Sequence, residues 1–492
     1  MLPKSRLTDP EAWSPLPPSD WNAERARHLL RRAGWSALPA QVAQAVSDGL
    51  AATLDRLFPA TASAWATPPA VQALWDEARE TLPGLNSRPP AERKKIRNEF
   101  RQRSRAVTQE MALEWMQRAC DPAQAAFEKW VFCLSDVYVT SEQKVRNAMF
   151  LHQHQDILRG HALGPAPQLT KAVSRSPAMI MYLDLQGSRQ QAPNENFARE
   201  LFELFVLGEG NYTESDIKEA ARAFVGYRQI QGRFAFARRQ ADPGRKSVFG
   251  QTGRFDGDAV IDLAYRQPAA ATFLPGEMVR FYLIADGLPP EDLLPLATWW
   301  RAHDFELRPL LHRFFGSRAF YDPAFRGNYI KSPVQFTLGL CQDLDLDVLP
   351  VLRFTLNNLR GMGQSLFDPP NVRGWVGGRQ WINSTTLTAR RNATRLAIHG
   401  VPERILNADE QLALTAAAAA GLGPFSLSPA HYRQWAQGSP RASAIHLVER
   451  LLPHPVPSAG IDTLTDLLAG RRSAAMPAAF LVLLSLPDYN LC

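Results

Sequence analysis

The densest group of side chains that could carry chemistry lies between Asn194 and Glu203. On a helix at about 100° per residue, the polar residues after Asn194 fall within an arc of about 140°, and Phe197 and Leu201 lie on the other face. Such an array could bind a hard metal ion, position a general acid and base, or hold a cationic substrate. The alternative is a helix whose Glu195, Arg199 and Glu203 form an ion-pair ladder on a solvated face. The polar residues in the arc are Glu195, Asn196, Arg199, Glu200 and Glu203.

A second unusual segment covers residues 367–383. Its prolines and glycines disfavour a helix, yet it keeps two tryptophans, so it is predicted to be a structured loop. Loops that combine indoles and amides often line ligand sites. The alternative is that the tryptophans pin the loop on the core and that Asn383 caps a helix over 384–397. The candidate ligand-binding residues are Asp368, Asn371, Arg373, Trp375, Trp381 and Asn383.

Together the two segments predict a polar pocket between the helix and the loop. In an enzyme, Glu200 or Glu203 would act as a base or a metal ligand, and Arg199 would pair with an anionic substrate group. Trp375 would stack on a ring. In a non-catalytic accessory protein, the same helix would hold an internal ion-pair network. The residue types favour no particular cofactor or metal.

Other active-site signatures are absent from the sequence. It contains no GxGxxG after a strand, no GxxxxGK[ST], no HExxH and no GxSxG. His152 and His154 would point about 160° apart on a helix, so joint metal ligation is not expected. The four cysteines form no CxxC or zinc-ligand spacing, which predicts buried free thiols.

Apolar recurrence at three and four residues, interrupted by prolines, predicts a mostly α, bundle-like single chain of about twenty helices. One short β-hairpin is expected, with strands over 227–230 and 233–237. Thr213 and Asp216 form a capping-box pattern, so a helix over 214–224 should follow a tight turn and pack on the polar helix. The other expected helices cover residues 23–33, 71–81, 91–118, 141–158, 195–207 and 333–340.

A soft boundary falls at residue 400. Residues 1–400 carry the polar motifs, and residues 401–492 are expected to be packing helices of the same domain. The longest apolar runs, 412–423 and 474–486, are too short or too broken to span a bilayer and are expected to be buried core helices. The first 21 residues contain no apolar signal region, so cytoplasmic residence is the default, with export by another route left open.

The charge excess is local. The 492-residue chain has 55 Lys and Arg against 48 Asp and Glu, an excess of seven. Residues 93–105 contain seven basic residues and one acidic residue, a net of six, so the rest of the chain is close to neutral. A charge run on a long helix is typically a solvated face, and aromatic interleaving is limited to Phe100. Nucleic-acid binding is therefore not favoured.

The order of several motifs resembles the bacterial domain of unknown function family 1800. The most specific motif is the segment from Asn194 to Leu201, and the resemblance covers nearly the whole chain. The other motifs lie at residues 28–35, 159–164, 176–184, 210–213, 331–334, 367–375 and 486–490.

The resemblance implies a mostly helical protein without an established reaction. It also implies work beside a sulfatase- or phosphatase-like partner on an envelope or polysaccharide substrate. Many members carry a His-x-His element after an aromatic-rich helix, where this chain has Ser135 to Tyr138, and a His-Asp pair after the hairpin, where it has Gln240 to Asp242. If those histidines bind metal or transfer protons, a degenerate or altered site is expected here.

Overall fold

The computed structural model describes residues 7, 9–470 and 475–492. Lys4 and Arg6 of the N-terminal stretch, and Ala474 of the last apolar run, lie outside this part. The described chain contains helices α1 to α23 and two small antiparallel sheets of two strands each. The prediction of a mostly α fold with a short hairpin is confirmed, and a second hairpin was not predicted.

The helix α5 lies at the centre of the N-terminal part and packs on α1 and α4. Prolines occupy the first position of several helices, where the missing N–H has no intrahelical partner to lose. Every residue of α5 is buried except Ser135 and Asp136 near its C-terminal end. The bounds are α1 (Ala23–Ala33), α2 (Pro39–Leu57), α3 (Pro69–Thr81), α4 (Pro90–Cys120) and α5 (Ala125–Val137).

The predicted helix over 141–158 is wrong, because the chain forms two helices there. Arg146 adopts φ 52°, and the side chain of Asn147 accepts a hydrogen bond from the N–H of Phe150 and starts the second helix. The helices that follow α5 are α6 (Glu142–Val145), α7 (Ala148–His161), α8 (Ala166–Ser174) and α9 (Pro177–Tyr182).

The polar segment begins as predicted but changes its helix type. It forms α10 (Glu195–Glu200) and continues directly as a π-helical turn, η5 (Leu201–Val206). Thr213 and Asp216 form the predicted capping box at the start of α11 (Glu214–Ala223), which packs on α10. Beyond the strands lie α12 (Gly257–Arg266), α13 (Ala270–Tyr282), α14 (Pro290–Arg301) and α15 (Leu307–Gly316).

Both hairpins turn through residues with positive φ. Strands β1 (Tyr227–Ile230) and β2 (Arg233–Phe236) pair with Tyr227 opposite Phe236, and Gln231 and Gly232 adopt φ 48° and 72°. Two consecutive positive φ values suit the twist of a two-residue hairpin. The unpredicted strands β3 (Lys246–Val248) and β4 (Gln251–Gly253) have three residues each, too few for a visible alternation.

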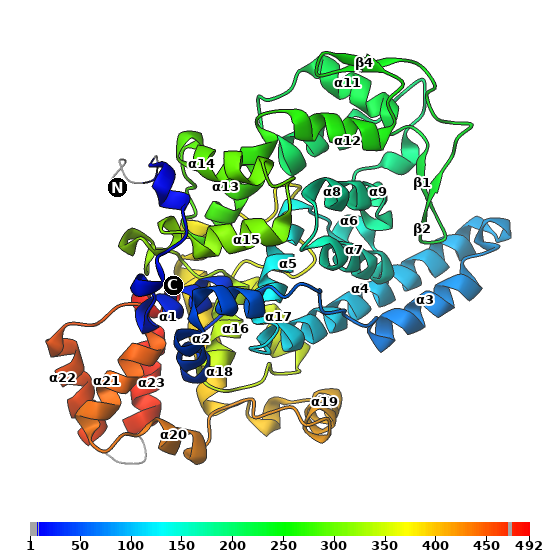
Figure 1. Ribbon diagram of the computed structural model, residues 1–492. Coiled ribbons are helices and arrows are strands. Elements are labelled where there is room, and N and C mark those ends of the chain that lie inside the picture. The colour runs from blue at the N-terminus through cyan, green and yellow to red at the C-terminus, as the bar shows by residue number, and fades with distance from the viewer. Residues whose placement is uncertain (1–6, 8, 471–474) are drawn as a thin grey trace.

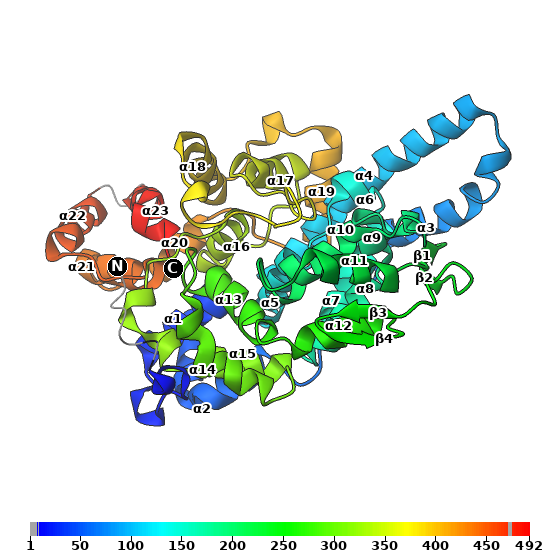
Figure 2. The same ribbon diagram turned by 90° about the horizontal axis from the view of Figure 1, so that it is seen from above.

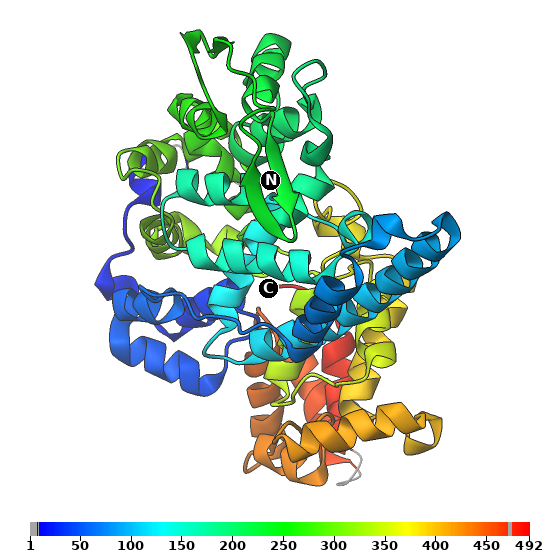
Figure 3. The ribbon, with the colours of Figure 1, turned by 90° about the vertical axis from the view of Figure 1, so that its right-hand side faces the viewer.

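The C-terminal helices form one end of the molecule, shown in orange and red in Figure 3. One face of α23 is buried as expected, with Phe480, Leu483 and Leu484 in the core, whereas Val482 on the other face is 50% exposed. The expectation for the run at 412–423 is wrong, because its alanines offer little apolar area and Leu412 is 67% exposed. The bounds are α16 (Pro333–Asp343), α17 (Leu352–Gly361), α18 (Ser384–His399), α19 (Ala408–Ala419), α20 (Pro429–Trp435), α21 (Pro440–Leu451), α22 (Ser458–Ala469) and α23 (Ala475–Ser485).

Helices α3 and α4 form an antiparallel pair that projects from the body of the molecule (Figures 1 and 2). The basic run of residues 93–105 lies on the N-terminal half of α4, and six of its seven basic side chains are exposed. Its charge excess is therefore solvated. Within the described ranges, no helix has the length and apolar character needed to cross a membrane.

Candidate functional site

A cavity of about 520 Å³ opens between η5, α13, the C-terminal end of α5 and the loop that follows α17. We call it the acidic cavity, because carboxylates dominate its charged lining. It joins the two segments that the sequence singled out, since η5 contributes Glu203 and the loop contributes Arg373. Its charged lining residues are Asp136, Glu203, Glu209, Glu277, Arg280 and Arg373.

Asp136 brings an unusual carboxyl group to this cavity from the last turn of α5. Burial raises the pKa of Asp136 to about 7, and the nearby carboxylate of Glu277 raises it further, while the hydrogen bond from Trp375 opposes the change. The backbone N–H of Trp375 donates to its Oδ1 at 3.0 Å. The side chain is only half-buried, so it is open to the cavity. Asp136 therefore exchanges a proton near neutral pH.

Gly374 allows the loop to approach Asp136 this closely. It adopts φ 78°, in the left-handed region that side chains disfavour, and a Cβ at this position would overlap Oδ1 of Asp136. The glycine is thus required twice, for the backbone conformation and for the contact with the carboxyl group.

Glu203 is held in place by a phenol and a guanidinium. Its Oε2 accepts a hydrogen bond from the hydroxyl of Tyr212 at 2.6 Å, and its Oε1 accepts one from Arg373 at 2.6 Å. Arg373 also pairs with Glu209. The π-helical turn of η5 shifts Glu203 out of the α-helical phase of α10, a distortion often found at functional sites.

The ion-pair ladder along the polar helix, considered as an alternative, does not form. Arg199 instead makes two hydrogen bonds to Glu214 of α11, at 2.7 and 2.8 Å, while Glu203 pairs with Arg373. Because α10 and α11 pack as a helical hairpin, Glu214 lies within hydrogen-bonding distance of Arg199. Glu203, which lies on the π-helical turn, pairs with Arg373 instead. Arg199 therefore joins two helices and lies outside the acidic cavity lining.

Glu200 lies next to the acidic cavity but not in its lining. Burial raises the pKa of Glu200, and the charge of Glu203 raises it further, while Arg373 and Arg199 oppose the change. Burial also raises the pKa of Tyr182 to about 12, with Glu200 and Asp368 adding to the effect. The charge of Arg373 therefore acts on Glu200 as well as on Glu203, but the contact between helix and loop is made at Glu203.

Three further predicted residues lie at the start of α10, and one of them, Asn194, binds the backbone. Asn194 caps α10, accepting from the N–H of Asn196 at 2.9 Å and donating to the carbonyl of Leu183 at 2.7 Å. Glu195 is half-buried and Asn196 is exposed, and both lie on α10 outside the acidic cavity. These contacts shape the helix start and contribute no group to the cavity.

The loop residues are divided among several tasks. Asp368 accepts from the hydroxyl of Ser141 at 2.6 Å and from the N–H of Gln143 at 3.1 Å, which ties the loop to α6. Asn371 accepts from the N–H of Arg373 at 2.8 Å and so orients the turn. Arg373 is the predicted loop residue whose side chain reaches Glu203.

The tryptophans of the loop pack on the core. Trp375 is half-buried with its ring 5.7 Å from that of Phe132, and it lines a separate cavity of only about 10 Å³. Trp381 is 6% exposed. Asn383 forms a capping box with Thr386 at the start of α18. This is the helix-capping role that was the alternative to ligand binding.

Asp136 and Glu277 were missed as site residues. Both lie on helices that the sequence marks mainly by their apolar residues, and only the packing of α5 on α13 brings them together. Asp136 did carry a signal, because it lies in the segment 135–138 that the resemblance marked as a departure from the expected motif. Asp242, from the second such position, pairs with Arg222 at 2.8 Å and does not line the acidic cavity.

The structure also tests the expectations about metals and thiols. Among the described residues, no group of three or more His, Cys, Asp or Glu side chains could hold a metal ion. His154 Nε2 lies 2.8 Å from the carbonyl of Tyr138, whereas His152 faces Asp156 on its own helix. All four cysteines are free, and Cys341 is the one that is only half-buried.

The fold and the cavity define a mostly helical protein with a carboxylate-lined pocket. The chain belongs to the family described as protein of unknown function (DUF1800), whose model matches residues 28–491. This match confirms the resemblance inferred from the motifs. Comparison with curated proteins and with solved structures gave no match.

Proposed function

We propose that the acidic cavity is the active site of an enzyme that performs general acid–base chemistry on a hydroxyl-rich substrate of the envelope or polysaccharide type. The observation that carries this proposal is Asp136, whose pKa burial raises to about 7 and which faces a cavity also lined by Glu203. A general acid or base works best when its pKa is near the working pH. Two carboxyl groups in different environments supply separate acid and base roles.

Each residue has a defined role in this proposal. Asp136, protonated in about half of the molecules at neutral pH, donates its proton to the leaving oxygen of a glycosidic bond. Glu203, oriented by Tyr212 and Arg373, takes a proton from the attacking water, whose oxygen bonds to the anomeric carbon. Phe273 in the lining offers an apolar face to a sugar ring.

The proposal is tested by incubating the full chain with soluble peptidoglycan and capsular polysaccharide fragments and measuring new reducing ends. We expect Asp136→Asn and Glu203→Gln each to lower the rate by about 10²-fold or more. Glu92→Gln, on the exposed part of α4, is the control that keeps the rate. Absence of new reducing ends with the unaltered chain contradicts glycosidic hydrolysis, and an unchanged rate in Asp136→Asn contradicts the role of Asp136.

A second candidate is a non-catalytic accessory protein that works with a sulfatase- or phosphatase-like partner. The observation in its favour is that Arg199 and Arg373 are already paired with Glu214, Glu203 and Glu209. In this case a pull-down with the partner succeeds equally well with the unaltered chain and with Asp136→Asn. Failure to recover a stable partner counts against it.

A further inference from the structure

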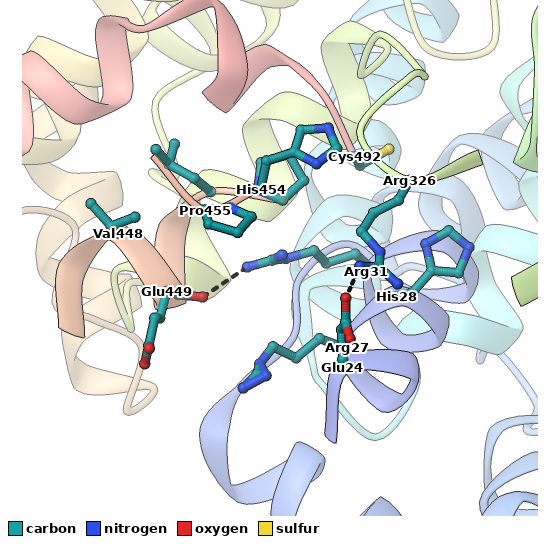
Figure 4. Close-up of a pocket in the computed structure, with 12 residues that line it drawn as sticks. Glu24, Arg27, His28, Arg31, Arg326, Val448, Glu449, His454, Pro455 and Cys492 are labelled. Carbon is teal, nitrogen blue, oxygen red and sulfur yellow. Dashed lines mark hydrogen bonds and ion pairs between the residues drawn. The ribbon is translucent and has the colours of Figure 1, made fainter. Parts of the chain in front are cut away.

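A second cavity, of about 330 Å³, lies between α1 and the segment that follows α21 (Figure 4). We call it the cationic cavity, because Arg27 and Arg31 of α1 face it together with Arg326 and His454. Its acidic lining residues are Glu24 and Glu449. The cavity is distinct from the acidic cavity, since the two share no lining residue.

The arginines of this cavity have spare hydrogen-bonding capacity. One nitrogen of Arg31, Nη2, donates to the backbone carbonyls of Arg450 at 2.9 Å and Glu449 at 3.5 Å, and Arg31 forms no ion pair with a carboxylate among the described residues. Arg326 pairs with Glu24, but its Nε is buried and meets no acceptor in the part of the chain that the structure describes. Arg27 and Arg31 form no ion pair among the described residues, so their guanidinium groups have N–H donors left for an added acceptor.

Two more cations are buried in and beside α1, the helix that supplies Arg27 and Arg31. Arg32 is fully buried and donates to the carbonyl of Tyr282 at 3.0 Å and to Asn328 at 2.6 Å. Lys129 donates to the carbonyls of Arg32 and Gly34, both at 2.8 Å, and burial lowers its pKa to about 7. Backbone carbonyls, and not carboxylates, therefore satisfy these cations.

Lys331 and Asp343 complete the charged surroundings. Lys331 lies 3.9 Å from the centre of the Tyr489 ring, and burial lowers its pKa to about 8. Asp343 accepts hydrogen bonds from Ser36 and from Tyr489, so its oxygens are already engaged. The region is rich in buried positive charge, and an anion placed in the adjoining cavity would offset part of its desolvation cost.

The imidazoles frame the cavity in different ways. His28 Nε2 lies 3.0 Å from the carbonyl oxygen of Phe320. Because a carbonyl oxygen can only accept a hydrogen bond, Nε2 carries the proton, and the uncharged ring lines the cavity. His454 lies directly over Gly327, where a Cβ would overlap its ring. Gly327, with φ 58°, thus leaves room for His454 at the mouth of the cavity.

We propose that the cationic cavity binds a tetrahedral oxyanion, the phosphate or sulfate group of an ester. Arg27 and Arg31 from one helix, Arg326 from another segment and His454 from a third approach the cavity from different sides. The fork of arginine suits phosphate and sulfate groups, and donors from several elements of the chain line this one cavity. The volume accommodates such a group with part of its ester.

The test is isothermal titration calorimetry of the full chain with inorganic phosphate, inorganic sulfate and acetate at equal ionic strength. We expect saturable binding of phosphate or sulfate at one site, and binding of acetate at least tenfold weaker. Whichever of the two tetrahedral anions binds more tightly indicates the ester. Absence of saturable phosphate and sulfate binding overturns the proposal, and so does acetate binding of equal strength.

Substitutions then locate the site. Arg27→Gln and Arg31→Gln should each weaken binding about tenfold or more, because a hydrogen bond to a charged group is worth at least that factor. Arg97→Gln removes the same charge from the exposed face of α4 and should leave the Kd within about twofold. Arg27 makes no side-chain hydrogen bond to the described residues, so its variant should fold even if Arg31→Gln does not. Unchanged binding in Arg27→Gln overturns the proposal.

Discussion

The acidic cavity and the cationic cavity hold their charges in opposite ways. Around the acidic cavity, Glu203 and Glu209 meet Arg373 at positions that are partly open to solvent. In and beside α1, the helix that lines the cationic cavity, Arg32 and Lys129 are buried and donate to backbone carbonyls. In the acidic cavity, Glu203 and Glu209 form ion pairs with Arg373. In contrast, Arg32 and Lys129 are buried in the protein interior and are satisfied by backbone carbonyls.

This difference predicts different costs in stability for substitutions at the two cavities. Removing one charge of a half-exposed ion pair lowers the free energy of unfolding only a little, because water solvates the charge that remains. Removing a buried cation leaves several carbonyl oxygens without a donor, which costs much more. We therefore expect variants of the acidic cavity to stay folded, and variants of the buried cations to unfold more easily.

The largest effect is expected for Arg32→Met. The substitution leaves the carbonyl of Tyr282 and the side chain of Asn328 without their donor, and we expect a loss of about 3 kcal/mol in the free energy of unfolding. Urea denaturation measures it. Arg27→Met, on the same helix but half-exposed, is the control and should stay within about 0.5 kcal/mol. Equal losses in the two variants would break the comparison.

A smaller effect is expected for Gly374→Ala. Its φ of 78° and the overlap of the new Cβ with Asp136 should together cost about 2 kcal/mol in the free energy of unfolding. Gly210→Ala is a matched control, because Gly210 has φ 80° and nothing within 4 Å of the added Cβ. The control should cost about 1 kcal/mol, and a difference of zero would mean that the contact with Asp136 is not close.

Asp136→Asn should stabilise the protein at high pH. The pKa of Asp136 in the folded protein, about 7, lies above its ordinary value of 3.8. The protonated carboxyl group therefore adds to the free energy of unfolding below about pH 4. This contribution is lost as the pH rises to 7, because the unfolded chain gives up the proton first. Asparagine can still accept from the N–H of Trp375 and has no such loss. We expect a gain of about 1 kcal/mol at pH 8, reduced by the exposure of the side chain, and none at pH 4. Thermal melts at both pH values measure it, and an equal gain at both would contradict the raised pKa.

The smallest effect on stability is expected for Arg373→Gln. Its ion pairs with Glu203 and Glu209 are partly exposed, so the free energy of unfolding should fall by less than about 1 kcal/mol. The loss should shrink further at 1 M salt, because salt screens exposed pairs. Denaturation at low and high salt measures it. A loss as large as that of Arg32→Met would remove the distinction between the two cavities.

Local rules predicted much of the fold. The helix over 23–33, the capping box of Thr213 and Asp216, the cap at Asn383 and the hairpin at Gln231 all depend on neighbouring residues, and all are confirmed. The break at Arg146 was not predicted, because no proline or glycine marks it. The exposure of α19 was not predicted either, since apolar content alone does not show what a helix packs on.

The composition of the acidic cavity depends on tertiary packing. The sequence predicted that the polar helix and the loop meet, and Glu203 and Arg373 do so across 170 residues. It could not predict that Arg199 turns to Glu214, because that pair depends on how α10 and α11 pack. Asp136 and Glu277 enter the cavity from helices with mostly apolar surfaces, and no spacing rule connects them.

The position of Asp136 within α5 has one more consequence. Asp136 lies in the last turn of this helix, where the backbone carbonyls carry a partial negative charge from the helix macrodipole. This partial negative charge disfavours a carboxylate. The end of α5 therefore helps Asp136 to keep its proton. A substrate group that brings partial positive charge to this point is favoured by the helix end as well as by the carboxylates around it.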